Sequence, residues 1–191
     1  GRDRLLDEMH VSEGESVLEV GCGTARNLII LAKRQPAANL YGLDASSAML
    51  DTAHSKIEGA NVKNIQLRTA LADDFKFDDT FGLIEPFDKI FFSYSISMIP
   101  PWRESIQNAL ANLKANGTLY FVDFCDQSDL PSTFQKFLKW WLSKFHVHHR
   151  PELITYLEGL ERNGTATISI SPLFRRYAFT AKVQKRTALN I

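Results

Sequence analysis

Residues 16–34, SVLEVGCGTARNLIILAKR, join a short apolar run to a helix-forming segment through a glycine-rich turn. The run Ser16–Val20 predicts a buried strand, and Ala25–Arg34 predicts a helix with its apolar residues on one face. Glycine at positions 21 and 23 allows a tight turn and lets a ligand approach the backbone closely. This order of elements predicts the first βα unit of a parallel sheet that binds a nucleotide-like ligand.

The alternation of strands and helices continues along the chain, which predicts βαβ units and a parallel sheet. The other expected strands are Asn39–Leu43, Ile65–Arg68, Lys89–Ser93 and Thr118–Phe124, and the other expected helices are Arg2–Met9, a segment from Ser46 or Ser47 to Ile57, and Pro101–Leu113, with a turn at Lys114–Gly117. After Cys125 the sequence predicts two helices, Pro131–Phe145 and Pro151–Glu161, and then two strands, Ala166–Ser171 and Tyr177–Val183.

These elements predict one α/β domain over residues 1–191, with residues 126–191 completing the sheet. The expected fold is a doubly wound, Rossmann-like, seven-stranded and mostly parallel sheet that ends in an antiparallel hairpin. The chain starts at Gly1 without a methionine, so we expect a longer natural N-terminus.

Composition excludes several classes of protein. The formal net charge is zero, which argues against electrostatic binding of nucleic acid. Two distant cysteines, Cys22 and Cys125, form neither a disulfide framework nor a zinc motif, and they predict reduced thiols in a cytoplasmic protein. No apolar run reaches the roughly 18 residues of a membrane span.

The residues around the glycine turn discriminate between cofactors. A dinucleotide fingerprint requires a third glycine at position 26, where this chain has Arg26. Glu19 stands two residues before the first glycine, where a carboxylate would repel a pyrophosphate and attract a cationic amine, such as that of S-adenosylmethionine. Asp44 ends the next strand, where its two oxygens can accept hydrogen bonds from both ribose hydroxyls. The alternative is a structural turn without a ligand.

VLEVGCGTARN, followed by LYGLDASSAML, resembles the first two motifs of the class I methyltransferases. The resemblance implies S-adenosylmethionine as cofactor and S-adenosylhomocysteine as its product. It also implies a set of cofactor-binding residues, namely Glu19, Gly21, Cys22, Gly23, Thr24, Asn27, Asp44, Ala45, Met49, Ala70, Leu71 and Ser93. Ala25 replaces that family's third glycine, a departure of one methyl group that we expect to be mild. Within this turn we expect the backbone of Cys22, not its thiol, to matter.

A narrower resemblance spans nearly the whole chain. GRDRLL, SYSISMIPPW, LPSTFQKFLKWWLSKFHV and PLFRRYAF are similar to segments of the bacterial betaine-lipid N-methyltransferases. This resemblance implies methylation of the amine of diacylglyceryl-homoserine, a lipid presented at a membrane surface.

The segment after the fourth expected strand lies where the acceptor should meet the cofactor. We expect Tyr94, Met98, Trp102 and Tyr177 to contact the substrate, and the aromatic rings to shelter a methylated ammonium through cation–π contacts. The alternative for each ring is packing in the core. Tyr94 and Tyr177 are also the candidates for a catalytic role. No side chain stands out as a general base, and solvent is a sufficient proton acceptor.

The expected helix Pro131–Phe145 has an apolar stripe, flanking lysines and an additional Trp140. Such a helix suits either an anionic lipid surface or packing against the sheet. His146, His148 and His149 follow it, but their spacing and the lack of a nearby acid or thiol argue against a metal site. We therefore expect no metal. The expected localisation is cytoplasmic, and the lipid substrate that the resemblance implies would allow a peripheral position on the inner face of the membrane.

Two other functions fit the same cofactor motifs. One is methyl transfer to a small soluble acceptor, which would not require the aromatic and basic C-terminal block. The other is cofactor binding without catalysis. A nicotinamide oxidoreductase is disfavoured by Arg26 and Glu19. The sequence does not indicate an oligomeric state.

Overall fold

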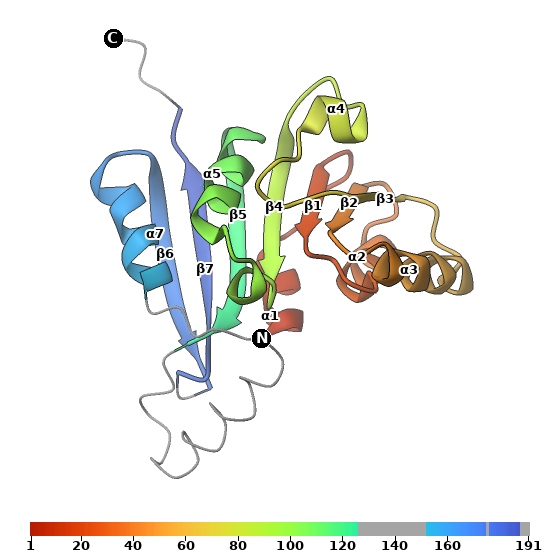
Figure 1. Ribbon diagram of the computed structural model, residues 1–191, viewed down its shortest axis with the longest axis horizontal. Helices are drawn as coiled ribbons and strands as arrows, with labels where there is room; N and C mark the ends of the chain where they lie inside the picture. Colours follow the sequence, from red (N-terminus) through yellow and green to blue (C-terminus); the bar gives the residue numbers. More distant parts are fainter. Residues whose placement is uncertain (126–151, 175, 188–191) are drawn as a thin grey trace.

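The computed structural model describes residues 1–125, 152–174 and 176–187. Within them, seven strands form one sheet in the order β3-β2-β1-β4-β5-β7-β6 (Figure 1). The strands are β1 (Ser16–Val20), β2 (Asn39–Asp44), β3 (Ile65–Thr69), β4 (Phe87–Ser93), β5 (Leu113–Phe124), β6 (Ala166–Leu173) and β7 (Ala178–Lys185). The helices are α1 (Arg2–Glu8), α2 (Arg26–Arg34), α3 (Ser47–Ala60), α4 (Phe77–Phe81), the short 3₁₀ helix η1 (Ile96–Met98), α5 (Trp102–Ala111) and α7 (Glu152–Arg162).

Strands β1 to β5 pair in parallel, and β7 pairs antiparallel with both β5 and β6. The register joins Phe124 at the end of β5 to Ala178 at the start of β7. The turn between β6 and β7 therefore lies at the same sheet edge as the carboxyl ends of the parallel strands. This arrangement confirms the predicted doubly wound, mostly parallel sheet with its C-terminal hairpin.

Helices cover both faces of the sheet because successive strand residues point to opposite sides. Leu18 and Val20 of β1 pack with α4, α5 and α7 in one apolar cluster. Val17 of β1 belongs to the other cluster, which contains α1, α2 and α3. Glu19 lies on the second side, since it alternates with Leu18 and Val20. The chain order changes direction between β1 and β4, which places the ligand crevice outside their carboxyl ends.

The structure corrects several details of the prediction. The expected turn Lys114–Gly117 lies inside β5, where the pairing with β4 jumps from Leu113 to Thr118 and Asn116 has a φ of 63°. It is therefore a local bulge within one strand. Helix α4 and η1 were not predicted, because each is too short to show an apolar period. The expected helix Pro131–Phe145 lies outside the described residues.

Ala25 is a further correction, because it is not the first residue of helix α2. It caps the helix with a left-handed backbone, at a φ of 58°, and is fully buried. Glycine adopts this conformation freely, whereas in a residue with a Cβ it costs roughly 1 kcal/mol of conformational free energy. The replacement of the third glycine is therefore a change of backbone preference as well as of size.

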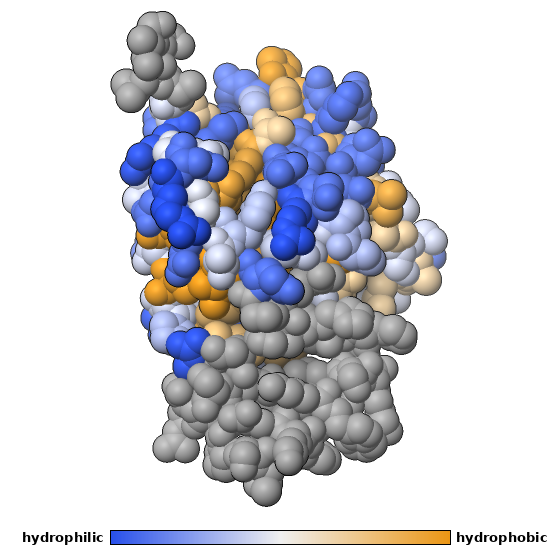
Figure 2. All heavy atoms as spheres, turned by 60° about the vertical axis from the view of Figure 1, so that its left-hand side comes forward, coloured by the Kyte–Doolittle hydropathy of each residue, from blue (hydrophilic) through white to orange (hydrophobic). Residues whose placement is uncertain are grey.

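Where Figure 2 colours the surface, hydrophilic side chains predominate, with smaller hydrophobic patches between them. No helix among residues 1–125, 152–174 and 176–187 combines the length and apolarity that crossing a membrane requires.

Gly42 in β2 lets the turn and helix α2 pack directly on the sheet. A Cβ at this position would lie 2.7 Å from side-chain carbons of Leu28 and Leu67 and 2.9 Å from the sulfur of Cys22. We expect Gly42→Ala to lower the free energy of unfolding by about 1–3 kcal/mol, as overpacked cores do. Denaturant unfolding monitored by circular dichroism measures this change.

Gly59→Ala is the matched control. Gly59 lies in helix α3, and a Cβ there would meet nothing within 4 Å. Because alanine favours the helix, this variant should be more stable by about 0.5–1 kcal/mol. Equal effects of the two substitutions would contradict the packing role of Gly42.

Candidate functional site

The glycine turn between β1 and α2 is held to the end of β2 by backbone hydrogen bonds. The N–H groups of Gly21 and Cys22 both donate to the carbonyl oxygen of Leu43, at 2.9 Å. Gly21 and Gly23 have φ values of 73° and 52°, which only glycine adopts without strain. A Cβ on Gly23 would point into open space, so the floor of the turn is free for a ligand.

The carboxylate of Asp44 is fixed against this turn. Its Oδ2 accepts a hydrogen bond from the N–H of Gly23 at 2.8 Å, and its Oδ1 accepts one from the N–H of Ser46 at 2.9 Å. A carboxylate has about four lone-pair directions, so each oxygen retains one for a ligand. The arrangement suits two adjacent hydroxyl donors, as a ribose offers.

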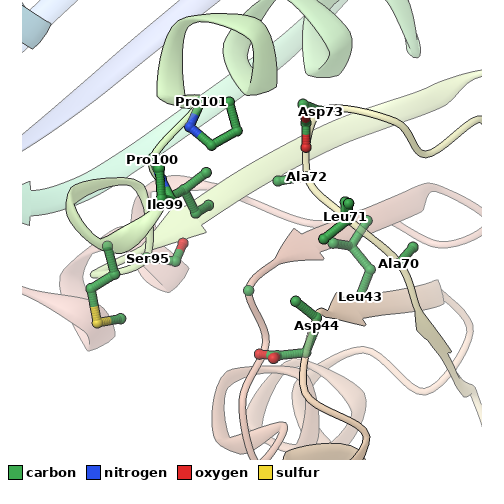
Figure 3. A pocket seen from close by; sticks show the side chains of 13 residues that line it. Leu43, Asp44, Ala70, Leu71, Ala72, Asp73, Ser95, Ile99, Pro100 and Pro101 are labelled. Carbon is green, nitrogen blue, oxygen red and sulfur yellow. The ribbon is translucent and has the colours of Figure 1, made fainter. Parts of the chain in front are cut away.

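A cavity of about 390 Å³ opens beside Asp44 (Figure 3). Figure 3 shows Leu43, Asp44, Ala70 and Leu71 along one side and the segment that follows β4 along the other. The cavity is lined by Gly21, Leu43, Asp44, Ala45, Ala70, Leu71, Ala72, Asp73, Ser95, Met98, Ile99, Pro100 and Pro101. Its mostly apolar wall with a few polar groups is typical of a small-ligand site.

Glu19 is the buried acid of the site. It is 2% exposed, and its Oε1 accepts a hydrogen bond from Nδ2 of Asn27 at 2.6 Å. Its Oε2 is also buried and has no hydrogen-bond partner among the described residues. Burial raises the pKa of Glu19 to about 8, against the opposing effects of Asn27 and the Arg2 charge. An amine cation beside Oε2 would supply the missing donor, so the residues present fit the methionyl end of S-adenosylmethionine.

Cys22 lies in the same turn as a buried thiol. Burial raises its pKa, and the carboxylates of Glu19 and Asp44 raise it further. A thiol that stays protonated is a poor nucleophile, which supports a backbone role for this residue.

The other expected cofactor residues are found around this centre. The hydroxyl oxygen of Thr24 accepts a hydrogen bond from Nζ of Lys56 at 2.9 Å. Met49 is exposed in the first turn of α3 and is absent from the cavity lining. The hydroxyl of Ser93 is buried and has no hydrogen-bond partner among the described residues.

Ser95 is a site residue that the sequence did not single out. The Ser95 hydroxyl donates to the carbonyl oxygen of Val20 at 2.7 Å. A Cβ added to Gly21 would lie 2.6 Å from the Cβ of Ser95. It therefore joins the segment after β4 to the glycine turn. Its place directly after a predicted strand was the available signal.

The four expected substrate residues separate into two groups. Met98 lines the cavity, and Tyr94 and Tyr177 each pack against Phe124, at ring-centroid distances of 4.9 and 5.6 Å. Trp102, in contrast, is 4% exposed. Its ring contacts Tyr156 edge-on at 5.4 Å, in the core between α5 and α7. The structure therefore assigns Trp102 to core packing and adds Phe124 to the aromatic group.

Trp140 and His146, His148 and His149 lie outside the described residues. Among residues 1–125, 152–174 and 176–187, no three side chains of the metal-ligating types come together.

Comparison with known proteins agrees with this geometry. Residues 11–158 match the family model described as "Methyltransferase domain". A demethylmenaquinone methyltransferase of Listeria welshimeri is 28% identical over 137 residues, which cover 71% of this chain and 56% of that protein. Its counterpart in Staphylococcus carnosus is 33% identical over 117 residues, or 61% of this chain and 46% of that protein. The chain thus spans about half the length of the curated relatives it matches.

Solved structures share the fold at low sequence identity. The YcgJ protein of Bacillus subtilis superposes with a TM-score of 0.75 at 14% identity, covering 98% of both chains. A putative methyltransferase of Bacillus halodurans has a TM-score of 0.69 at 18% identity, covering 97% of this chain and 99% of that one. Coclaurine N-methyltransferase, solved with N-methylheliamine and S-adenosylhomocysteine, has a TM-score of 0.56 at 15% identity, over 65% of this chain and 35% of that one.

Replacement of Asp44 by alanine is expected to weaken binding of S-adenosylhomocysteine, because the ribose hydroxyls lose their acceptors. Each lost hydrogen bond is worth about 0.5–1.5 kcal/mol. Isothermal titration calorimetry measures the affinity, with Asp51→Ala on the exposed side of α3 as the control. An Asp44 variant with wild-type affinity would remove Asp44 from the site.

Glu19 should make the stability of the ligand-free protein depend on pH. Its pKa rises from 4.5 to about 8 on folding, so the folded protein keeps a proton that the unfolded chain releases. The resulting stabilisation is complete below pH 4.5 and is lost as the pH rises through 8. In Glu19→Gln this dependence should disappear. Between pH 4.5 and 8, the free energy of unfolding of the variant should therefore rise by about 2–4 kcal/mol relative to that of wild type.

Urea unfolding over a pH series measures the effect, with the exposed Glu13→Gln as a control that should follow wild type. Parallel pH profiles for wild type and Glu19→Gln would be incompatible with a buried, neutral Glu19.

Proposed function

From this chain's membership of the methyltransferase domain family, with S-adenosylmethionine as its cofactor, we propose a substrate. The whole protein methylates the amine of diacylglyceryl-homoserine. In each of three successive transfers the acceptor nitrogen would first lose a proton to solvent and then take the methyl group, with S-adenosylhomocysteine as the leaving group. The product of the third transfer is the trimethylated betaine lipid. When bound, the cofactor supplies an electrophilic methyl group on its sulfonium. The task left to the residues of this chain is to hold the acceptor nitrogen close to it and in line.

The aromatic group of Tyr94, Phe124 and Tyr177 is the observation that carries this proposal. The three rings lie at the carboxyl ends of β4 and β5 and at the start of β7, which is the sheet edge that also carries Glu19 and Asp44. An amine acceptor becomes a permanent cation when it is fully methylated, and aromatic faces attract such cations. Tyr94 and Tyr177 are therefore proposed to position the acceptor, with Met98 beside it.

Exposed apolar side chains at the same edge support an acceptor with acyl chains. Leu71 and Met98 at the cavity are 58% and 49% exposed, and Phe174 in the turn between β6 and β7 is 66% exposed. A lipid surface would cover such residues. We propose that the protein attaches peripherally to the cytoplasmic face of the inner membrane.

A second candidate acceptor is demethylmenaquinone, which the curated relatives methylate according to their names. The similarity favours it, but the match covers only about half of those proteins. Methylation of a quinone ring carbon creates no fixed positive charge, so it makes no use of a cation-binding aromatic group. The amine acceptor accounts for that group and is preferred.

The test is methyl transfer from labelled S-adenosylmethionine to each acceptor in mixed micelles, using the full-length protein. We expect labelled mono-, di- and trimethyl forms of diacylglyceryl-homoserine, and no labelled quinone. Asp44→Ala, as a cofactor-site control, should reduce the label.

Label in the quinone alone would replace the amine proposal with the quinone one. Label in neither lipid, with cofactor binding intact, would contradict both and direct the search to a soluble acceptor or a non-catalytic role.

A further inference from the structure

The three aromatic rings form a continuous row along the sheet edge. Tyr94 directly follows β4 and has a left-handed backbone, at a φ of 54°, and its N–H donates to the carbonyl oxygen of Val122 at 2.8 Å. Its ring packs on Phe124 at an angle of 57°, and Phe124 meets Tyr177 edge-on at 90°. All three residues are half-buried.

A positive charge already lies on this row. The guanidinium carbon of Arg2, in the first turn of α1, is 5.2 Å from the centroid of the Tyr94 ring. That distance is within the range of about 6 Å for a cation–π contact. The carboxylate of Asp123, which accepts hydrogen bonds from the N–H groups of Ser97 and Phe124, adds negative charge at the same edge.

We propose that the Tyr94 ring is a binding site for a methylated ammonium ion, and that the Arg2 guanidinium occupies this site until such a ligand displaces it. The natural ligand would be the amine headgroup of the acceptor, and to that extent the inference rests on the proposed function. Arg2 would then compete with the headgroup for the ring, so its charge would lower the affinity of the site for an ammonium ion.

Competition between the two cations follows from their charges. A guanidinium and an ammonium that share one aromatic face repel each other, so the ligand binds either against that repulsion or after Arg2 has moved away. Arg2 lies on the short, solvent-facing first turn of α1 and is exposed, so its side chain can leave without opening the core. Removal of its charge should therefore strengthen ammonium binding.

The alternative is that Arg2 only covers the ring and that the ring has no ligand. The same helix offers a control for this reading. Arg4 carries the same charge, but its guanidinium pairs with the carboxylate of Glu8 at 2.7 Å, whereas Arg2 is the cation over the Tyr94 ring. Arg2→Gln and Arg4→Gln change the net charge equally, so a difference between them reports position and not total charge.

Choline is the probe, and its uncharged analogue with carbon in place of nitrogen is the control ligand. Binding to the full-length protein is measured by ligand-observed NMR at fixed ionic strength, without cofactor. We expect Arg2→Gln to bind choline about two- to fivefold more tightly than wild type, as a displaced cation–π contact implies. Arg2→Lys and Arg4→Gln should stay close to wild type, and the uncharged analogue should be indifferent to all three.

Tyr94→Leu tests the ring itself and should abolish the choline signal, and Tyr177→Leu, which leaves β4 intact, should weaken it. Unchanged or weaker choline binding by Arg2→Gln would overturn the inference, as would an equal gain in Arg4→Gln. The measurement needs neither cofactor nor lipid. Failure of methyl transfer therefore contradicts the proposed function without affecting this result, and the reverse also holds.

Discussion

The hydrogen bond from the Gly23 N–H to the Asp44 carboxylate joins the two parts of the sequence on which the site depends. It fixes the acid at the end of β2 against the turn that follows β1, and the second oxygen of the same carboxylate accepts from Ser46 at the start of α3. One side chain thus orients a turn, a strand end and a helix start. Because both oxygens are already held, the remaining lone pairs point in fixed directions. Binding of a ribose therefore costs no further conformational entropy of the Asp44 side chain.

Glu19, at the other end of the turn, is a buried acid with only one of its two oxygens hydrogen-bonded among the described residues. This arrangement costs stability if the group is charged. The raised pKa is the protein's response, since a neutral acid is easier to bury. A bound cation would reverse that preference and favour the carboxylate. Binding of a cationic group beside Glu19 would therefore be coupled to release of the proton that the ligand-free protein keeps there.

Much of the fold could be predicted because the parallel strands are short apolar runs with clear ends. The bounds of β1 were predicted to the residue, and Asp44 and the glycine turn followed from spacing. The fate of Trp102 could not be predicted, because a tryptophan after a strand suits both a site and a core, and only the position of α7 decides between them. The left-handed Ala25 and the bulge within β5 were also missed, since both arise from tertiary contacts and not from local preference. The acceptor could not be derived from the cofactor-binding residues, because any acceptor would need the same cofactor site.

The antiparallel hairpin explains how the two halves of the site come together. Parallel strands deliver Glu19 and Tyr94 to one edge, but Tyr177 is distant in sequence and reaches that edge only because β7 begins beside Phe124. The charge of Arg2 acts on both halves of the site. Burial raises the pKa of Glu19 and that of Tyr94, and the Arg2 charge opposes both shifts. A cationic cofactor and a cationic acceptor would meet at the place where the ligand-free protein keeps its own positive charge. A neutral acceptor would leave Arg2 in place, whereas a cationic headgroup would have to displace it or bind against its repulsion.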